Sequence, residues 1–246
     1  YRAEGIAARF IEKPRCATGT AAILLNAAAQ NEIVVALGAS AQLQPRDIDP
    51  ALIRGARVVI CQHEANLPVN AHVFRLARKA GAVAVLNPAP MRADFDPSIL
   101  TLTDVLIPNE SEFAALVNRL GGVTALQESC DGGRRTVRAR KGSAPPFTEA
   151  ALHAMGQDEL HRLCQTLGAP TVIVTLGQRG CFVSQSGGPT FIPAHTGIKV
   201  VDTTGAGDAF VGGFAAGLVQ SGGNVVAAAR HGSTVAALSV TKFGTA

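Results

Sequence analysis

The sequence predicts an α/β protein with a mostly parallel sheet covered by helices on both faces. Short apolar segments alternate with segments of helical periodicity along most of the chain. The apolar segments are continuous rather than alternating, which is typical of strands buried on both faces of a parallel sheet. Of the 246 residues, 47% are hydrophobic and 16% charged, which is enough for a large core and argues against disorder.

The expected elements follow one another in a regular order. The expected strands are residues 57–61, 82–86, 105–107, 170–175 and 198–201, with a short antiparallel pair at 181–183 and 190–192. The expected helices are residues 69–79, 111–120, 209–219 and 225–238. Gly81 ends the first helix, and Asn224 caps the last. Phe113, Leu116 and Leu120 share one face of the second.

The first part of the chain predicts a β-hairpin that stands apart from this sheet. Strands within 18–26 and at 33–38 flank a turn at 30–32. We therefore expect a hairpin with its connections at residues 1–40. The α/β core follows at residues 41–246 and carries a Gly- and Arg-rich insertion near 121–147.

The insertion holds several of the basic residues of a chain whose net charge is only +4. It has no clear periodicity, which favours a solvated, mobile segment. Nucleic-acid contact is the alternative, but the chain has no Trp and one Tyr to interleave with the basic residues. The clustered basic residues are Arg134, Arg135, Arg138, Arg140 and Lys141.

Composition also bears on the compartment. Five cysteines, at positions 16, 61, 130, 164 and 181, form no C-x-x-C pair, which favours a reducing compartment such as the cytoplasm. No apolar run has membrane length, and no signal peptide is found. The chain begins at Tyr1 without Met and stops at Ala246, so we expect both ends to lie within a longer protein.

Polar turns follow several of the expected strands. In parallel sheets, ligands bind at the carboxyl ends of the strands. Several polar turns at this edge of the sheet therefore predict a ligand site. These turns are residues 61–64, 87–90, 108–110, 175–177 and 202–204.

The most informative segment is residues 202–210, Asp-Thr-Thr-Gly-Ala-Gly-Asp-Ala-Phe. It reads as a strand, a glycine turn and a helix start. Gly205 and Gly207 let backbone N–H groups face one concavity, and the helix N-terminus favours an anion there. Asp208 would lie beside that anion, where a carboxylate could take a proton from an attacking hydroxyl. The alternative is a glycine turn in which Asp208 is an ordinary helix cap.

Other catalytic motifs are absent from the sequence. A dinucleotide fingerprint would need glycine at Phe210, which argues against a nicotinamide oxidoreductase. No P-loop occurs, no histidine completes a zinc-protease motif after His63-Glu64, and no G-x-S-x-G is present.

The segment 202–208 resembles the D-T-x-G-A-G-D signature of the ribokinase-like sugar kinases, the phosphofructokinase B group. Residues 31–39, 86–90 and 108–112 also resemble ribokinase segments, in the same order. The resemblance covers nearly the whole chain outside the insertion. It implies a three-layer sandwich with a small β lid, to which the hairpin at 18–38 would belong. The family's N-terminal Gly-Gly sugar-binding motif has no match here.

The resemblance also implies roles for individual residues. Asp208 would be the catalytic base and contact the sugar, with Gly205, Ala206 and Gly207 as the backbone anion hole. Asn109 and Glu112 would organise Mg²⁺ and the phosphates, although a helix cap and a first-turn acid would show the same pattern. Glu64 would bind the sugar, or be a solvated loop carboxylate. The nucleotide side would comprise Thr175, Leu176, Gly177, Gln178, Arg179, Gly180 and Ser233, and the monovalent-cation site Asp202, Thr204, Ser239, Lys242 and Gly244.

The expected activity is ATP-dependent phosphorylation of a sugar primary hydroxyl, with ribose as the expected acceptor and Mg²⁺ and K⁺ as the ions. Another kinase of the group, acting on fructose, deoxyribose or a nucleoside, is one alternative. A non-catalytic nucleotide- or sugar-binding protein on the same fold is the other. The resemblance further implies a homodimer formed through the lid. Neither nucleic acid nor a membrane is expected as a partner.

Overall fold

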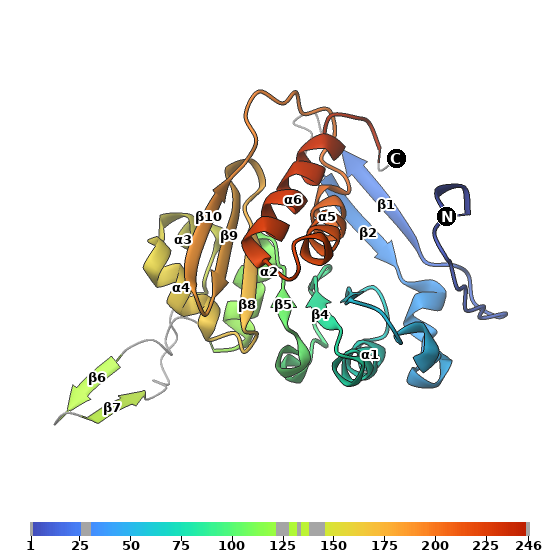
Figure 1. Cartoon of the computed structure of the whole chain (residues 1–246), viewed down its shortest axis with the longest axis horizontal. Coiled ribbons are helices and arrows are strands. Elements are labelled where there is room, and N and C mark those ends of the chain that lie inside the picture. Colours follow the sequence, from blue (N-terminus) through green and yellow to red (C-terminus); the bar gives the residue numbers. More distant parts are fainter. Residues whose placement is uncertain (1, 26–30, 122–127, 132–133, 138–145, 245–246) are drawn as a thin grey trace.

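The computed structural model describes residues 2–25, 31–121, 128–131, 134–137 and 146–244 (Figure 1). The strands are β1 (Thr20–Leu25), β2 (Asn31–Ala36), β3 (Val58–Cys61), β4 (Val83–Leu86), β5 (Val105–Leu106), β6 (Glu128–Asp131), β7 (Arg134–Val137), β8 (Thr171–Thr175), β9 (Gly180–Gln185) and β10 (Gly188–Pro193). The helices are α1 (Leu67–Ala80), α2 (Glu110–Arg119), α3 (Glu149–Ala154), α4 (Gln157–Gln165), α5 (Ala206–Gln220) and α6 (Val225–Ser239).

The central sheet has six strands in the order β10-β9-β8-β5-β4-β3. The four strands from β3 to β8 pair in parallel, and β9 and β10 add an antiparallel edge. This confirms the mostly parallel sheet and the short antiparallel pair expected from the sequence. The carboxyl ends of the parallel strands therefore lie along one edge, where the polar turns were expected.

Apolar side chains from the sheet enter two separate cores, because successive residues of a strand point to opposite faces. On β8, Val172 and Val174 pack in the core beneath α1, α2 and α4, whereas Ile173 packs beneath α5 and α6. Leu86 and Val85 on β4 divide in the same way. Figure 1 shows α5 and α6 together on one face of the sheet. The fold is thus helix, sheet and helix in three layers.

The hairpin near the N-terminus is confirmed as a two-stranded antiparallel sheet, separate from the central one. Its return strand begins at Asn31, whereas the sequence placed a turn at 30–32. The ladder continues through the Leu25–Asn31 pair, and Gln30 lies outside the described residues.

The insertion contains a second antiparallel hairpin, β6–β7, that the sequence did not predict. In Figure 1 it projects from the body of the protein. Arg134 and Arg135 lie on β7. The described residues do not include Arg138, Arg140 and Lys141. The flanking parts of the insertion, for which a mobile segment was expected, also lie outside the described residues.

Local chemistry explains where α1 ends and where α6 begins. Gly81 adopts a left-handed conformation with φ of 71°, which glycine takes without a steric penalty, and ends α1 as predicted. The Asn224 side chain accepts a hydrogen bond from Ala227 N, which confirms the predicted cap of α6. Phe113 and Leu116 are buried on α2, but Leu120 lies at its end and is 37% exposed.

The strand expected at 198–201 does not form. The N–H groups of Val201 and Asp202 donate to the Val240 carbonyl at the end of α6 instead of to a neighbouring strand (2.7 and 3.3 Å). Val200 and Val201 are both exposed. Apolar character predicted a strand here, but no strand of the described residues pairs with this segment.

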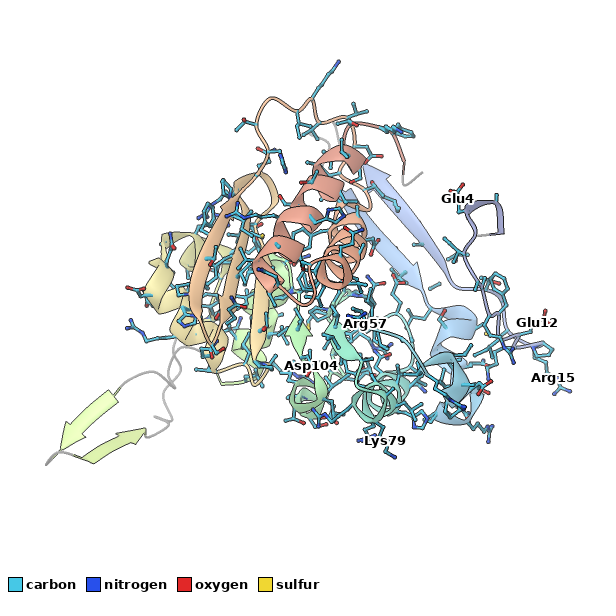
Figure 2. The ribbon with its side chains drawn as sticks, in the orientation of Figure 1. Glu4, Glu12, Arg15, Arg57, Lys79 and Asp104 are labelled. Atoms are coloured by element: carbon cyan, nitrogen blue, oxygen red, sulfur yellow. The ribbon has the colours of Figure 1, made fainter. Side chains whose placement is uncertain are left out.

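Several charged side chains lie on the outside of the molecule. Figure 2 shows Glu12, Arg15 and Lys79 pointing away from the body. Within the described ranges, no helix is both long and apolar enough to cross a membrane.

Candidate active site

Asp208 lies in the first turn of α5 and faces the carboxyl end of β3. The Gln62 side-chain amide donates to Asp208 Oδ1 at 2.8 Å, across 146 residues of sequence. The residue before α5 is Gly205, and no side chain caps the helix there. Asp208 therefore is not the helix cap that was its alternative interpretation, and its exposed carboxylate is open to a ligand.

The two glycines of the turn have different structural reasons. Gly205 has φ of 75°, a left-handed conformation that disfavours any side chain. Gly207 has ordinary helical geometry, and a Cβ built on it would meet no protein atom within 4 Å. Within the described residues, the Gly207 and Asp208 N–H groups have no acceptor, as expected for a first helical turn. The fold therefore does not require glycine at position 207. The absence of a side chain leaves space beside N–H groups that a ligand could use.

A cavity of about 690 Å³ opens beside this turn. Its lining includes the start of α2, the end of β8, the segment after β10, the start of α5 and one side of α6. Such a volume is typical of small-molecule and nucleotide sites. The predicted residues that line it are Asn109, Thr175, Gly177, Gln178, Gly180, Ala206, Gly207 and Ser233. Leu176 and Arg179 belong to the same loop but are not part of this lining.

Sequence reasoning missed several residues of the cavity. Glu110 and Glu149 add carboxylates to its wall, and His195 adds an imidazole. Glu110 Oε1 lies 2.5 Å from His153 Nε2, which joins α3 to the cavity rim. Glu110 lies in the polar turn at 108–110 but was given no role of its own. No motif marks Glu149 and His195, since they reach the cavity through α3 and the loop after β10.

Asn109 and Glu112 form a reciprocal cap at the start of α2. Asn109 Oδ1 accepts from Glu112 N, and Glu112 Oε2 accepts from Asn109 N, both at 2.9 Å. Glu112 is only 7% exposed. Its burial raises the carboxyl pKa, the Asn109 N–H opposes this, and the nearby negative charge of Asp208 raises it further. The capping interpretation is therefore correct, and the pair also lies within electrostatic range of Asp208.

The residues predicted for a cation site meet around Asp202, which is 4% exposed. Its carboxylate accepts from Thr204 N at 2.8 Å and from Gly244 N at 3.0 Å, and these bonds lower its pKa. Lys242 N donates to the Ser239 carbonyl at the end of α6. The predicted set therefore comes from two segments that the fold brings together.

Glu64 lies exposed in the turn between β3 and α1. No hydrogen bond or ion pair is formed by its side chain within the described part of the chain. Glu64 stands two residues after Gln62, in the same turn at the carboxyl end of β3. Its proposed sugar contact stays a prediction.

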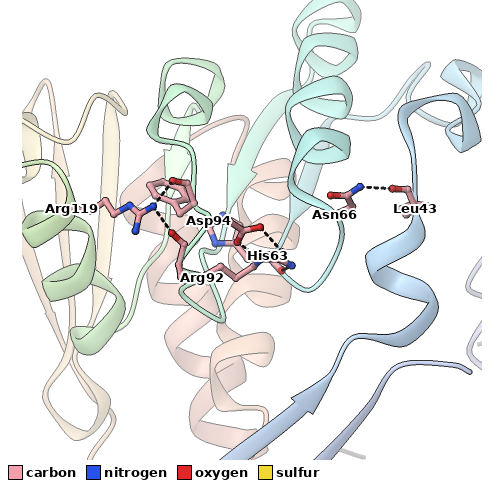
Figure 3. Close-up of polar contacts among 8 residues, drawn as sticks. Leu43, His63, Asn66, Arg92, Asp94 and Arg119 are labelled. Carbon is pink, nitrogen blue, oxygen red and sulfur yellow. Dashed lines mark hydrogen bonds and ion pairs between the residues drawn. The ribbon is translucent and has the colours of Figure 1, made fainter.

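His63, between Gln62 and Glu64, is completely buried, and neither ring nitrogen has a hydrogen-bond partner at normal distance. Its ring packs against Phe95, with centroids 5.3 Å apart. Arg92, which lies nearby and pairs with Asp94, is drawn with it in Figure 3. Burial first, and the Arg92 charge second, lower the pKa of His63 to about 4, while the carbonyls of Pro90 and Pro88 partly oppose this.

We expect His63 to make folding less stable in mild acid. The unfolded imidazole binds a proton near pH 6.5 and the folded one only near pH 4, so between these values the unfolded chain binds more protons. Stability should fall as the pH drops through this window, by on the order of 3 kcal/mol in total. Urea unfolding at pH 7.5, 5.5 and 4.5 measures this loss. In His63→Leu the loss should be smaller by this amount, and an identical pH dependence in both proteins would contradict the assignment.

The fold and site together define an α/β protein with a nucleotide-sized cavity, a helix N-terminus and a carboxylate at the carboxyl edge of its sheet. The whole chain, residues 1–246, matches the pfkB family carbohydrate kinases. The chain belongs to that family.

Individual relatives agree with this. The chain is 34% identical to mouse ribokinase over 204 residues, covering 81% of this chain and 53% of that protein. It is 31% identical to a Salmonella typhi deoxyribokinase over 244 residues, covering 98% and 69%. The structure is similar to Arabidopsis thaliana ribokinase complexed with ribose and ATP, with a TM-score of 0.69 and 25% identity, covering 94% of this chain and 65% of that one. The chain thus spans between about half and two thirds of these proteins.

Proposed function

We propose that this chain carries the catalytic centre of an ATP-dependent sugar kinase that phosphorylates the primary hydroxyl of D-ribose. The observation that carries the proposal is the start of α5. Ala206 and Gly207 line the cavity there, the Gly207 N–H has no acceptor within the described residues, and the exposed Asp208 carboxylate follows in the same helical turn. Transfer would proceed in line. The sugar O–H gives its proton to Asp208, its oxygen bonds the γ-phosphorus, and the bond to the leaving ADP breaks.

The anion hole would be the backbone of Gly205, Ala206 and Gly207. The Ala206 N–H donates to the Thr203 carbonyl at 3.1 Å, whereas the Gly207 N–H has no acceptor within the described residues and would lie beside the charge that develops in the transition state. The loop at 175–180 and Ser233 would hold the nucleotide. Glu64 would bind a sugar hydroxyl from the β3 side. The nucleotide role is supported by the lining of the cavity, to which Glu64 and Gly205 do not belong. The choice of ATP and ribose is supported by the complex of the similar Arabidopsis enzyme.

Two ions fit residues of this chain. Glu112 keeps Oε1 without a hydrogen-bond donor among the described residues, close to Asp208, so with Asn109 it could hold Mg²⁺, mostly through water. Mg²⁺ bound there would neutralise phosphate charge. K⁺ would be held near Asp202, Thr204, Ser239, Lys242 and Gly244, largely by carbonyl oxygens.

The test is ADP release from MgATP by the purified protein, with and without K⁺, across ribose, deoxyribose, fructose and adenosine. We expect ribose-dependent turnover that K⁺ stimulates. Preference for deoxyribose would move the substrate assignment toward the similar deoxyribokinase. Nucleotide binding without transfer to any sugar would favour a non-catalytic binding protein instead.

We also propose that the protein dimerises through the hairpin β1–β2 and works in the cytoplasm. Ile23, Val34 and Val35 of this hairpin are exposed apolar residues, which a second copy could cover. The free thiols of Cys16, Cys61, Cys164 and Cys181 fit a reducing compartment. The mass of the protein in solution tests the dimer.

A further inference from the structure

Three strand ends meet beside Asp208, and each contributes a residue directly after its last strand position. Gln62 follows β3, Asn87 follows β4 and Ile107 follows β5. The parallel register continues past the strands, because Asn87 N donates to the Cys61 carbonyl at 3.1 Å and Ile107 N to the Leu86 carbonyl at 2.8 Å. The residues at this edge are therefore placed by the sheet itself, not by a flexible loop.

A chain of side-chain hydrogen bonds runs along this edge to Asp208. The Asn87 amide nitrogen donates to the Ile107 carbonyl at 2.8 Å. Gln62 Nε2 donates to Asn87 Oδ1 and to Asp208 Oδ1, each at 2.8 Å. Since Asn87 uses its nitrogen on a carbonyl, it can present only its oxygen to Gln62. Gln62 must then offer its NH₂ group, and the second hydrogen of that group points to Asp208.

Burial fixes the Asn87 end of this chain of bonds, whereas the bond from Gln62 to Asp208 is exposed. Asn87 is 8% exposed, which protects its bonds from competition with water. The backbone of Gln62 is held as well, because Asn70, itself 2% exposed, donates to the Gln62 carbonyl at 2.7 Å. Both the backbone and the amide of Gln62 are thus set before any ligand arrives.

We propose that Gln62, oriented by Asn87, is the positioning residue of the Asp208 carboxylate. By occupying Oδ1, the Gln62 amide limits rotation of the carboxylate and leaves Oδ2, which has no donor within the described part of the chain, to receive the proton of the acceptor hydroxyl. The inference rests on the proposed role of Asp208 as the general base. Glutamine is suited to the position since it donates without adding charge next to a carboxylate.

The decisive variant is Gln62→Met, which keeps the length of the side chain and removes the donor. We expect kcat to fall by about 10–100-fold, as for a misplaced catalytic group, with KM for ATP and ribose nearly unchanged. Gln62→Glu should be at least as slow, because it places a second carboxylate against Asp208. Gln165→Met is the control, since it removes one amide bond, to Ser184 at 3.0 Å, far along the chain on α4. It should leave kcat unchanged.

A double-variant comparison separates this inference from the proposed function. In the Asp208→Asn background, Gln62→Met should cause no further loss, because its effect acts through Asp208. Full activity of Asp208→Asn would overturn the proposed function itself. If Asp208→Asn is inactive while folded Gln62→Met or Gln62→Glu keeps the parent kcat, only the positioning role is wrong. If Gln62→Met does not fold, the near-isosteric Gln62→Glu carries the test.

Discussion

Replacing Asp208 by Asn is expected to lower kcat by about 10²–10⁴-fold, the range for loss of a general base. Asn keeps the size of the side chain, and its oxygen can still accept from Gln62 Nε2. The fold and the binding of ATP should therefore persist. Initial rates of ADP release at saturating MgATP and ribose measure the loss, and nucleotide titration measures the binding.

The matched control is Asp158→Asn, which changes an exposed carboxylate in the first turn of α4, outside the cavity lining. Its kcat should equal that of the parent. Near-normal turnover in Asp208→Asn would show that another group takes the proton. An equal loss in both variants would point to a general effect of charge.

Replacing Gly232 by Ala is expected to destabilise the protein by about 1–3 kcal/mol, the range for overpacking. Helices α5 and α6 approach closely here: a Cβ on Gly232 would lie 2.7 Å from the Phe210 carbonyl oxygen and 3.1 Å from Phe214 N. Backbone atoms cannot move aside as a side chain can, so α6 must shift. Because Ser233 and Ala236 of α6 line the cavity, ATP affinity should fall as well.

The control for this change is Gly212→Ala, on α5, where the added methyl group would meet nothing within 4 Å. It should stabilise the protein by up to about 1 kcal/mol, since alanine favours a helix more than glycine does. Urea denaturation of both variants gives the two free energies. The proposed role of close helix packing fails if Gly232→Ala is as stable as Gly212→Ala.

Parts of the fold could be predicted from the sequence where the residues of one helix or strand determine its structure locally. The buried strand β8 and the glycine that ends α1 were identified because their residues determine local structure directly. Residues 198–201 carried an equally apolar signal, yet Val201 pairs with the Val240 carbonyl instead of a strand. Whether an apolar segment becomes a strand depends on its neighbour in space, which local sequence does not contain.

The site shows the same limit. Gly205 and Asp208 stand in one motif, from which the sequence predicted the glycine turn and the start of α5. The contact between Gln62 and Asp208 joins the end of β3 to the first turn of α5 across 146 residues, and a glutamine after a strand has many other uses. Gly207 was expected for its backbone freedom, but its geometry is helical, and a Cβ at this position would meet no protein atom within 4 Å. Only the packed structure distinguishes these two reasons for a glycine.

Helix α6 contacts both the cavity proposed for the nucleotide and the Asp202 segment proposed for the cation. Ser233 and Val240 line the cavity, and the Val240 carbonyl also holds the backbone of Val201 and Asp202. A cation that orders the Asp202 segment would therefore favour one position of α6, and a nucleotide that fills the cavity would do the same. If nucleotide and cation bind as proposed, the two binding equilibria are coupled through α6. By thermodynamic reciprocity, a cation that strengthens nucleotide binding by some factor is itself bound more tightly by the same factor when nucleotide is present.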